Sequence, residues 1–359
     1  MKILIAGAGP TGLTAAIELA RLGLTARIVD AKKAPSPRSR AVGISSHSLD
    51  LLEASGVAAK LLDAGLKIKR ANVRGRNRTL AAIDITLLRH KYNFLLCLPQ
   101  NRTEEIMIDV LDSLGGTVEF DTAVKSISSE HGKVLVALEH EGQRSEDIYD
   151  IVIGADGIHS TVRQQAGIDF PGHTHPNKWS IADFDSPDFP WPQDEIHLFA
   201  LKPGYIGLAV CIGDRRYRAI ANHPDALKYV PGKYTVSQVL FADDFYIPVQ
   251  LADTFQKGKI FIAGDAAHVQ SPVGARGMNM GIEDACALAR RIVDGTTAGY
   301  TDERRPVGER WQKRSERMLA LVESENPATI YFRNVLFSLV THIPAVQRQL
   351  LPFLMGLRE

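Results

Sequence analysis

Cysteine, net charge and long apolar runs are all scarce in this sequence. Its 359 residues include three cysteines, Cys97, Cys211 and Cys286, which lie far apart and form no CxxC pair. This spacing argues against a disulfide framework, a structural zinc site and a dithiol redox centre, and it favours a reducing cytoplasm. No metal ligands are predicted. The formal charge of +1 at pH 7 provides no broad field for attracting nucleic acid, so we expect no nucleic-acid partner.

No apolar run approaches the roughly 20 residues needed to cross a bilayer, so we expect no transmembrane segment. The uncharged stretch between Arg333 and Arg348 is interrupted by His342 and Pro344. It therefore predicts helices that pack or self-associate, for example in a homodimer. The first apolar run, Ile3 to Ala6, is too short for a signal-peptide core and predicts a β-strand.

The regular elements predict an α/β fold. A β-α-β unit opens the chain, with strands over Lys2–Ala6 and Ala26–Val29 around a helix. The continuous apolar runs Asp150–Ala155 and Lys259–Ala263 predict buried parallel strands. Another helix is expected near Asn101, where Asn101 and Glu104 have capping-box spacing. Three further helices are expected over residues 279–293, 303–324 and 328–355.

Residues 170–250 differ from the rest of the chain. They hold 13 of the 25 aromatic residues, repeated Pro and Gly, and no long helical period. We interpret them as an antiparallel sheet that is inserted into the nucleotide-binding fold and forms the substrate-facing wall of a largely apolar pocket. Tyr205, Tyr217 and Tyr246 could hydrogen-bond a phenol, although sheet packing is the simpler role for each.

The first motif is a Gly-rich turn between a strand and a helix. Gly7 permits the tight turn, Gly9 lets the backbone approach a pyrophosphate, and Gly12 lets the helix pack on the strand. Asp30 ends the next strand, where its carboxylate can bind ribose hydroxyls and disfavours a 2′-phosphate. The motif therefore predicts NAD or FAD without choosing between them. Its predicted cofactor-binding residues are Gly7, Gly9, Pro10, Thr11, Gly12 and Asp30.

The second motif, Gly154 to Ser160 followed by Arg163, comes directly after a buried strand. It resembles the DG motif of class A FAD-dependent monooxygenases, the family of p-hydroxybenzoate hydroxylase. The resemblance implies that Asp156 and Gly157 lie near the FAD pyrophosphate. It also implies that His159 and Arg163 contact NADPH. An ordinary turn would explain Asp-Gly by itself.

The third motif, Gly264-Asp265-Ala266-Ala267-His268 with the loop from Ser271 to Asn279, resembles the GD motif of the same family. The resemblance assigns Asp265 to the ribityl chain of FAD and the loop to the isoalloxazine edge. A Gly-rich loop that opens a helix would also present N–H groups to a reduced flavin. Ala275 stands where many relatives have Gly, which would be costly if a positive φ were needed. The predicted cofactor-binding residues here are Gly264, Asp265, Pro272, Gly277, Met278 and Asn279.

Two further polar residues match family positions near the flavin. Arg40 precedes a short predicted strand, and Gln100 precedes the helix near Asn101. Both residue types are usually solvated on surfaces, so the resemblance alone carries these two assignments.

Together these features predict a Rossmann-like FAD-binding domain with a parallel sheet, an inserted antiparallel-sheet substrate region and C-terminal helices. The expected ranges are 1–70, 98–169 and 255–300 for the first, 71–97 and 170–254 for the second, and 301–359 for the helices.

The resemblance implies hydroxylation of a small aromatic or polycyclic molecule by NADPH or NADH and O2, through a flavin C4a-hydroperoxide. No catalytic side chain is predicted, because the cofactor carries the chemistry. The alternatives are a flavin-dependent halogenase, although the WxWxIP signature is missing, a reductase on the same fold, and a non-catalytic FAD redox sensor.

Overall fold

The apolar runs predicted to be buried strands meet in one sheet that is mainly parallel. The computed structural model describes residues 1–36, 41–75 and 79–358, and within them this sheet has the order β20-β21-β12-β1-β2-β8. Its strands are parallel except β20, which pairs antiparallel with β21. All residues of β1 and β12 are buried, as expected for central parallel strands. The strands are β1 (Ile3–Ala6), β2 (Ala26–Val29), β8 (Val118–Glu119), β12 (Ile151–Gly154), β20 (Gln256–Lys257) and β21 (Ile260–Ile262).

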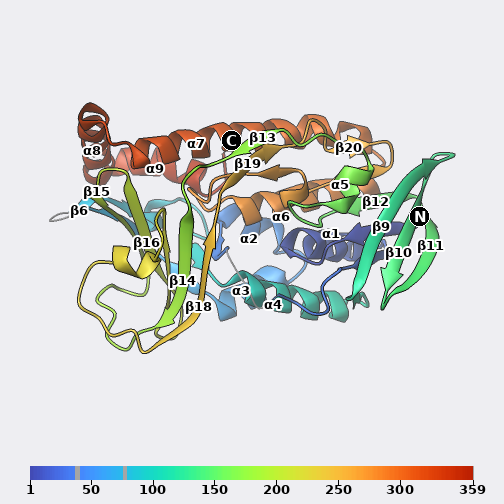
Figure 1. Ribbon diagram of the computed structural model, residues 1–359, viewed down its shortest axis with the longest axis horizontal. Helices are drawn as coiled ribbons and strands as arrows, with labels where there is room; N and C mark the ends of the chain where they lie inside the picture. The colour runs from blue at the N-terminus through green and yellow to red at the C-terminus, as the bar shows by residue number, and fades with distance from the viewer. Residues whose placement is uncertain (37–40, 76–78, 359) are drawn as a thin grey trace.

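Helices and a β-meander surround this sheet. Helix α1 (Pro10–Arg21) packs against both α4 (Gln100–Ser113) and α6 (Gly277–Val293). The meander separates β8 from β12 in the sequence and lies at the end of the molecule marked by the N-terminus (Figure 1). It consists of β9 (Thr122–Glu130), β10 (Lys133–His140) and β11 (Gln143–Tyr149).

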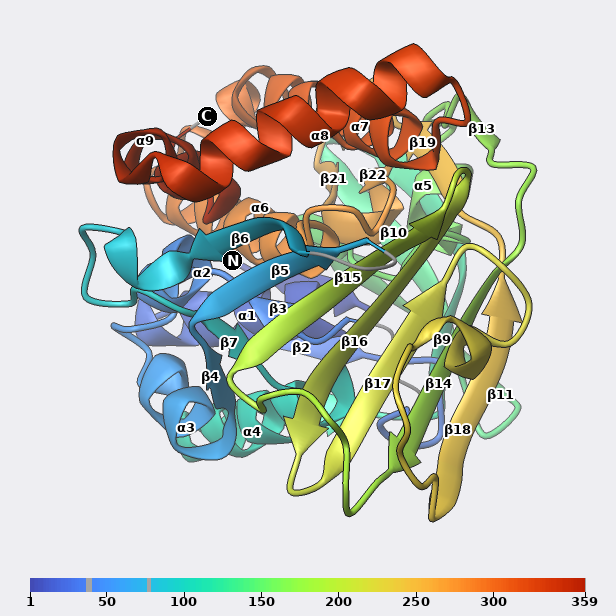
Figure 2. The same cartoon turned by 90° about the vertical axis from the view of Figure 1, so that its left-hand side faces the viewer.

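The second large sheet is mainly antiparallel. Its order in the described residues is β18-β14-β17-β16-β15-β5-β6, and Figure 2 looks onto it. β5 joins the sheet by pairing parallel with β15, so an early segment of the chain lies beside the expected insertion. The strands are β5 (Arg70–Arg74), β6 (Thr79–Asp84), β14 (Trp179–Asp185), β15 (Glu195–Lys202), β16 (Tyr205–Gly213), β17 (Arg216–Ala221) and β18 (Gln238–Phe245).

The remaining elements before the C-terminal helices are short. The small-sheet strands are β3 (Gly43–Ile44), β4 (Leu66–Ile68), β7 (Leu95–Cys97), β13 (Gly172–Thr174), β19 (Pro248–Leu251) and β22 (His268–Val269). The short helices are α2 (Ser46–Leu51), α3 (Val57–Ala64) and α5 (Thr161–Gln165). The 3-10 turns are η1 (Ile85–Leu87), η2 (Ala226–Tyr229), η3 (Gly264–Ala266) and η4 (Thr297–Gly299).

The C-terminal helices lie along one side of the molecule (Figures 1 and 2). They are α7 (Tyr300–Glu323), α8 (Pro327–His342) and α9 (Pro344–Leu354). The helical stretch expected over residues 328–355 thus consists of two helices, interrupted at Pro344 as the sequence indicated. The chain breaks at Ile343 because the residue before a proline is pushed out of the helical region, and Ile343 is extended.

The capping box expected at Asn101 does not form. Helix α4 begins one residue earlier, at Gln100, after Pro99, and no side chain caps it. Glu104 instead accepts a hydrogen bond from the Gln100 side chain. Within the described residues, no helix has both the length and the apolar character required to cross a membrane.

Candidate active site

A cavity of about 750 Å³ is lined by residues from both large sheets. The three predicted motifs contribute to its lining with Gly7, Gly9, Pro10, Thr11, Asp30, Asp156, Gly157, Asp265, Pro272, Gly277 and Met278. Strands β14 to β17 of the second sheet contribute aliphatic side chains to the same cavity. The structure thus brings together segments that are more than 100 residues apart in the sequence.

The first motif combines close packing with open space. A Cβ on Gly12 would lie 1.9 Å from the Gly7 carbonyl oxygen, so only glycine fits there. Gly7 has φ of +102° and lies against the Ala155 backbone of the second motif. At Gly9, by contrast, an added Cβ would meet nothing within 4 Å. The backbone at Gly9 and the N-terminus of α1 therefore face room for an anionic group, as a pyrophosphate site requires.

Asp30 is held in a fixed orientation at the cavity. Its Oδ2 accepts the Ala8 N–H at 2.7 Å, and its Oδ1 accepts the Lys32 N–H at 2.8 Å. The side chain is buried but still lines the cavity. Each carboxylate oxygen can accept a second hydrogen bond, so ribose hydroxyls fit here.

In the second motif, Asp156 has a structural contact that sequence reasoning did not anticipate. Its carboxylate accepts the Ser160 hydroxyl and, at 3.1 Å, the Val162 N–H at the start of α5. Burial raises the pKa of Asp156 above its ordinary value. Gly157 follows with φ of +81° and lines the cavity.

Arg163 connects the second motif to the third. Its guanidinium donates to the Ile158 carbonyl at 2.8 Å and to the Ala266 carbonyl at 3.0 Å. It also lies 3.8 Å from the centre of the Phe170 ring and is almost completely buried. This geometry does not support the expected contact of Arg163 with NADPH. His159, its partner in that expectation, is exposed and lines the cavity.

The third motif packs directly on the first. A Cβ on Gly264, which has φ of +60°, would lie 2.4 Å from the Thr11 hydroxyl oxygen. This contact sets η3 against the start of α1 and leaves Asp265 exposed on the cavity lining. Asp265 therefore lines the same cavity as the first motif.

Asn279, near the start of α6, fixes the loop that precedes this helix and does not itself line the cavity. The Asn279 amide donates to the carbonyls of Gly43 and Ala275 at 2.9 and 2.7 Å. Its oxygen accepts from the Ser45 N–H and the Ser48 hydroxyl, both at 2.8 Å. These bonds hold Ala275 at φ of +53°, so the departure from Gly carries the expected strain.

Sequence reasoning missed a buried charge network behind this loop. Asp284 accepts from Arg304 at 2.7 Å, contacts His268 at 2.6 Å and accepts the Gly264 N–H at 3.1 Å. Burial alone would raise the pKa of Asp284, but the adjacent His268 and Arg304 lower it. Glu283 bridges Arg304 to Arg276, which lines the cavity. Because its members are up to 36 residues apart, no local pattern reveals this network.

The two remaining predicted residues have different outcomes. Gln100 lines the cavity at the start of α4 and donates to Glu104 at 2.8 Å. Burial raises the pKa of Glu104. Arg40 lies outside the described residues.

The second sheet forms one wall of the cavity, and this wall is mostly aliphatic although residues 170–250 are rich in aromatics. Its lining side chains are Ile181, Ile196, Leu208, Val210 and Ile220, with Phe245 and Tyr246 at one edge. The aromatic residues Phe184, Phe189, Trp191, Tyr217 and Tyr234 instead pack together in a separate cluster. Side chains alternate between the faces of a sheet, so neighbouring residues on one strand enter different environments. Tyr205 and Tyr217 are outside the lining, as sheet packing predicts.

Residues 1–226 and 233–315 match the family model for the FAD binding domain. The chain belongs to this family. FAD is therefore its cofactor, and the Rossmann-like FAD-binding fold predicted from the motifs is confirmed. The residues present fit the cofactor, since Gly9 and the N-termini of α1 and α6 open on a cavity that is also lined by Asp30 and Asp265.

Similar proteins include two curated monooxygenases. The chain is 30% identical to 6-methylpretetramide 4-monooxygenase of Streptomyces rimosus over 351 residues, which cover 90% of this chain and 63% of that protein. It is 29% identical to pentachlorophenol 4-monooxygenase of Sphingobium chlorophenolicum over 310 residues, covering 81% and 57%. The chain thus spans less than two thirds of the length of either relative.

Solved structures share the fold. The p-nitrophenol 4-monooxygenase of Pseudomonas putida DLL-E4 superposes with a TM-score of 0.90 at 19% identity, covering 99% of this chain and 98% of that one. Aklavinone-11 hydroxylase, solved with FAD and aklavinone, gives 0.77 at 22% identity, covering 89% and 68%.

Proposed function

We propose that this chain is an FAD-dependent monooxygenase that hydroxylates a small aromatic or polycyclic molecule, with NADPH or NADH and O2 as co-substrates. The observation that carries the proposal is one cavity shared by the three cofactor motifs and an aliphatic wall. The names of the relatives, which act on a pretetramide and a chlorinated phenol, support this substrate class. Bound FAD would accept a hydride from the nicotinamide and activate O2.

In this proposal each motif holds one part of the cofactor. Gly7, Gly9, Pro10, Thr11 and Gly12 provide the pyrophosphate turn, with Asp156 and Gly157 beside it. Asp30 binds the adenosine ribose, and Asp265, after Gly264, binds the ribityl chain. Pro272, Gly277 and Met278 face the isoalloxazine, and Asn279 fixes their loop. Arg40 and Gln100 are the two other residues that we propose to contact the flavin. The N–H groups at the start of α6 stabilise negative charge on the reduced ring system.

The aliphatic wall has two roles. It offers an apolar surface with few fixed polar groups, which suits a flat substrate held by area rather than by many hydrogen bonds. It also keeps water from the reacting region, which protects a reactive oxidant from wasteful decay. No side chain is proposed to form a bond with the substrate.

The test is aerobic turnover of the FAD-loaded protein with NADPH and with NADH, against a panel of phenols and polycyclic phenols under ¹⁸O2. We expect substrate to accelerate nicotinamide oxidation and the product to gain one ¹⁸O atom. Nicotinamide oxidation coupled to substrate reduction would instead indicate a reductase, and halide incorporation a halogenase. Reversible flavin reduction without turnover of any substrate would indicate a redox sensor.

Domain division, assembly and location also belong to the proposal. We keep the domain ranges expected from the sequence, and the presence of two large sheets and a set of C-terminal helices supports a division of this kind. A homodimer is supported by the exposed side chains of α8, including Tyr331, Phe332 and Leu336. Light scattering of the purified protein measures its oligomeric state.

A cytoplasmic location is supported by three buried cysteines, all free.

A further inference from the structure

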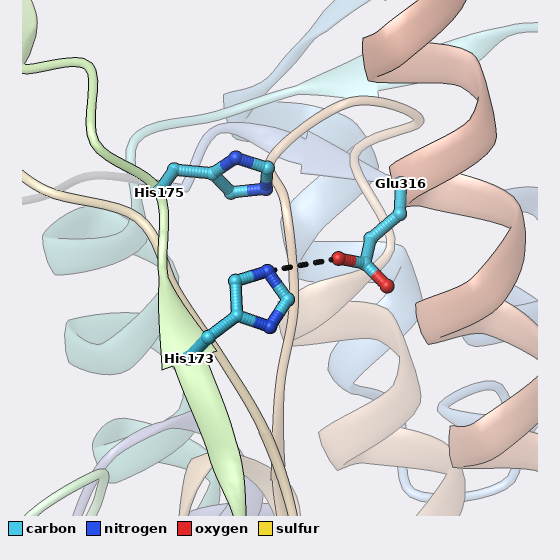
Figure 3. Close-up of side chains that lie close together, drawn as sticks. All are labelled: His173, His175 and Glu316. Carbon is cyan, nitrogen blue, oxygen red and sulfur yellow. Dashed lines mark ion pairs between the residues drawn. The ribbon is translucent and has the colours of Figure 1, made fainter.

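Two histidines and a carboxylate meet outside the cavity lining. His173 lies on β13, His175 follows that strand directly, and Glu316 faces them from α7 (Figure 3). One potential ligand atom from each residue lies within 4.8 Å of the other two. His173 Nε2 and Glu316 Oε1 are 3.0 Å apart.

The backbone holds these side chains in place. Residues two apart on an extended strand project to the same side, so both imidazoles face α7. His173 pairs with Val249 of β19, and the His175 N–H donates to the Ile247 carbonyl at 2.9 Å. On the other side, Leu319 of α7 is buried in the same apolar cluster as Val249. The geometry thus depends on packed elements on both sides.

An ion pair between His173 and Glu316 does not account for the position of His175 beside them. Its Nε2 is buried and has no hydrogen-bond partner. A buried polar atom without a partner costs free energy, and such an atom needs an explanation. The side chains of His173 and Glu316 are 56% and 34% exposed, so an ion from solvent can reach the cluster.

We propose that His173, His175 and Glu316 bind a divalent transition metal of the zinc class, with water completing the coordination. Two imidazoles and one carboxylate suit zinc, copper or nickel, whereas calcium and magnesium prefer oxygen ligands alone. Tetrahedral zinc, with ligands at about 2.0–2.2 Å, needs its donor atoms about 3.3 Å apart. The ligand atoms of His173 and Glu316 are already near this separation. Rotation of the His175 side chain would bring its ring nitrogen to the same separation from them.

The bound metal joins β13 to α7. His175 is hydrogen-bonded to Ile247, which lines the cavity together with Pro248. The metal therefore braces the connection between the FAD-binding part and the second sheet beside the cavity wall. None of the three ligands belongs to the cofactor motifs or lines the cavity, so none is expected to contact FAD.

The experiment uses untagged, FAD-loaded protein treated with EDTA and titrated with Zn²⁺ by calorimetry. We expect one equivalent to bind, and we expect Zn²⁺ to raise the thermal midpoint of unfolding. Cu²⁺ substituted at the site should give an electron paramagnetic resonance spectrum with coupling to imidazole nitrogen, because oxidised flavin is silent.

Variants locate the site. His175→Gln and Glu316→Gln should each weaken Zn²⁺ binding by at least about tenfold, since loss even of supporting groups costs that much. His342→Gln, an exposed histidine on α8 that bonds its own helix, is the matched control and should bind like the parent. The flavin absorption spectrum reports whether each variant is folded. Absence of saturable Zn²⁺ binding, or binding unchanged in both site variants, would overturn the proposal.

Discussion

The two large sheets contribute to the same cavity in different ways. The first sheet offers backbone N–H groups, glycines and carboxylates, all held within short segments that follow β1, β2, β12 and β21. The second offers single aliphatic side chains from β14, β15, β16 and β17. Cofactor recognition is therefore local in the sequence, whereas the substrate surface is spread over several strands. This difference predicts that mutations on the two sides have separable effects.

The largest effect is expected for Gly12→Ala. The new Cβ would overlap the Gly7 carbonyl oxygen, so α1 must move away from β1. We expect a loss of about 3 kcal/mol in the free energy of unfolding, together with loss of flavin. Urea unfolding and the ratio of flavin to protein absorbance measure both.

Gly9→Ala is the matched control, because its Cβ meets nothing within 4 Å. It should unfold like the parent while binding FAD more weakly. If Gly9→Ala retained full FAD affinity, the assignment of the open space at Gly9 to the cofactor would be wrong.

Asp265→Ala comes next. Loss of a charge-assisted hydrogen bond costs about 1.5–3 kcal/mol, so FAD affinity should fall about 10- to 150-fold. Flavin fluorescence during titration of the apoprotein gives the dissociation constant. Unchanged affinity would remove Asp265 from the ribityl chain.

Ile220→Ala examines the other side of the cavity. It removes aliphatic surface from the wall without touching the three motifs. We expect kcat/KM to change by about 10-fold for a substrate that contacts Ile220, with FAD affinity unchanged. Tyr217→Phe, in the aromatic cluster of the same strand, should leave both quantities unaltered. An equal effect of both changes on turnover would contradict the division between the two faces.

The smallest effect is expected for Ala275→Gly. Glycine removes the strain of φ +53°. It also raises the conformational entropy of the unfolded chain, which opposes folding, so the net gain in the free energy of unfolding is about 0.5 kcal/mol. Thermal unfolding measures it. A destabilised variant would show that the Ala275 methyl group contributes packing that outweighs the strain.

Much of the FAD-binding side was predictable because its signals are local. Strand β2 has the predicted bounds, Ala26–Val29, and the three motifs line one cavity as their positions after strands implied. The start of α4 was predicted to within one residue, but its cap was not: Asn101 and Glu104 have capping spacing, yet the helix already begins after Pro99.

The contacts that fix the motifs were not predictable. Arg163 donates to Ala266, 103 residues away, and Asn279 bonds to Gly43, 236 residues away. Neither partner can be identified from spacing, because only the folded chain brings them together. The same limit applies to the aliphatic wall, since the richness of residues 170–250 in aromatics does not say which face of the sheet they occupy.

By itself, the sequence determined the cofactor class and the strand-turn-helix units that bind it. A tight turn, an open phosphate site and a ribose acceptor each need particular residues at short, fixed spacings. The tertiary structure decided how these units lock together, which side chains face the substrate, and that His173 and His175 meet Glu316 of α7. Those outcomes depend on alternation and packing between distant strands and helices, and no local spacing encodes them.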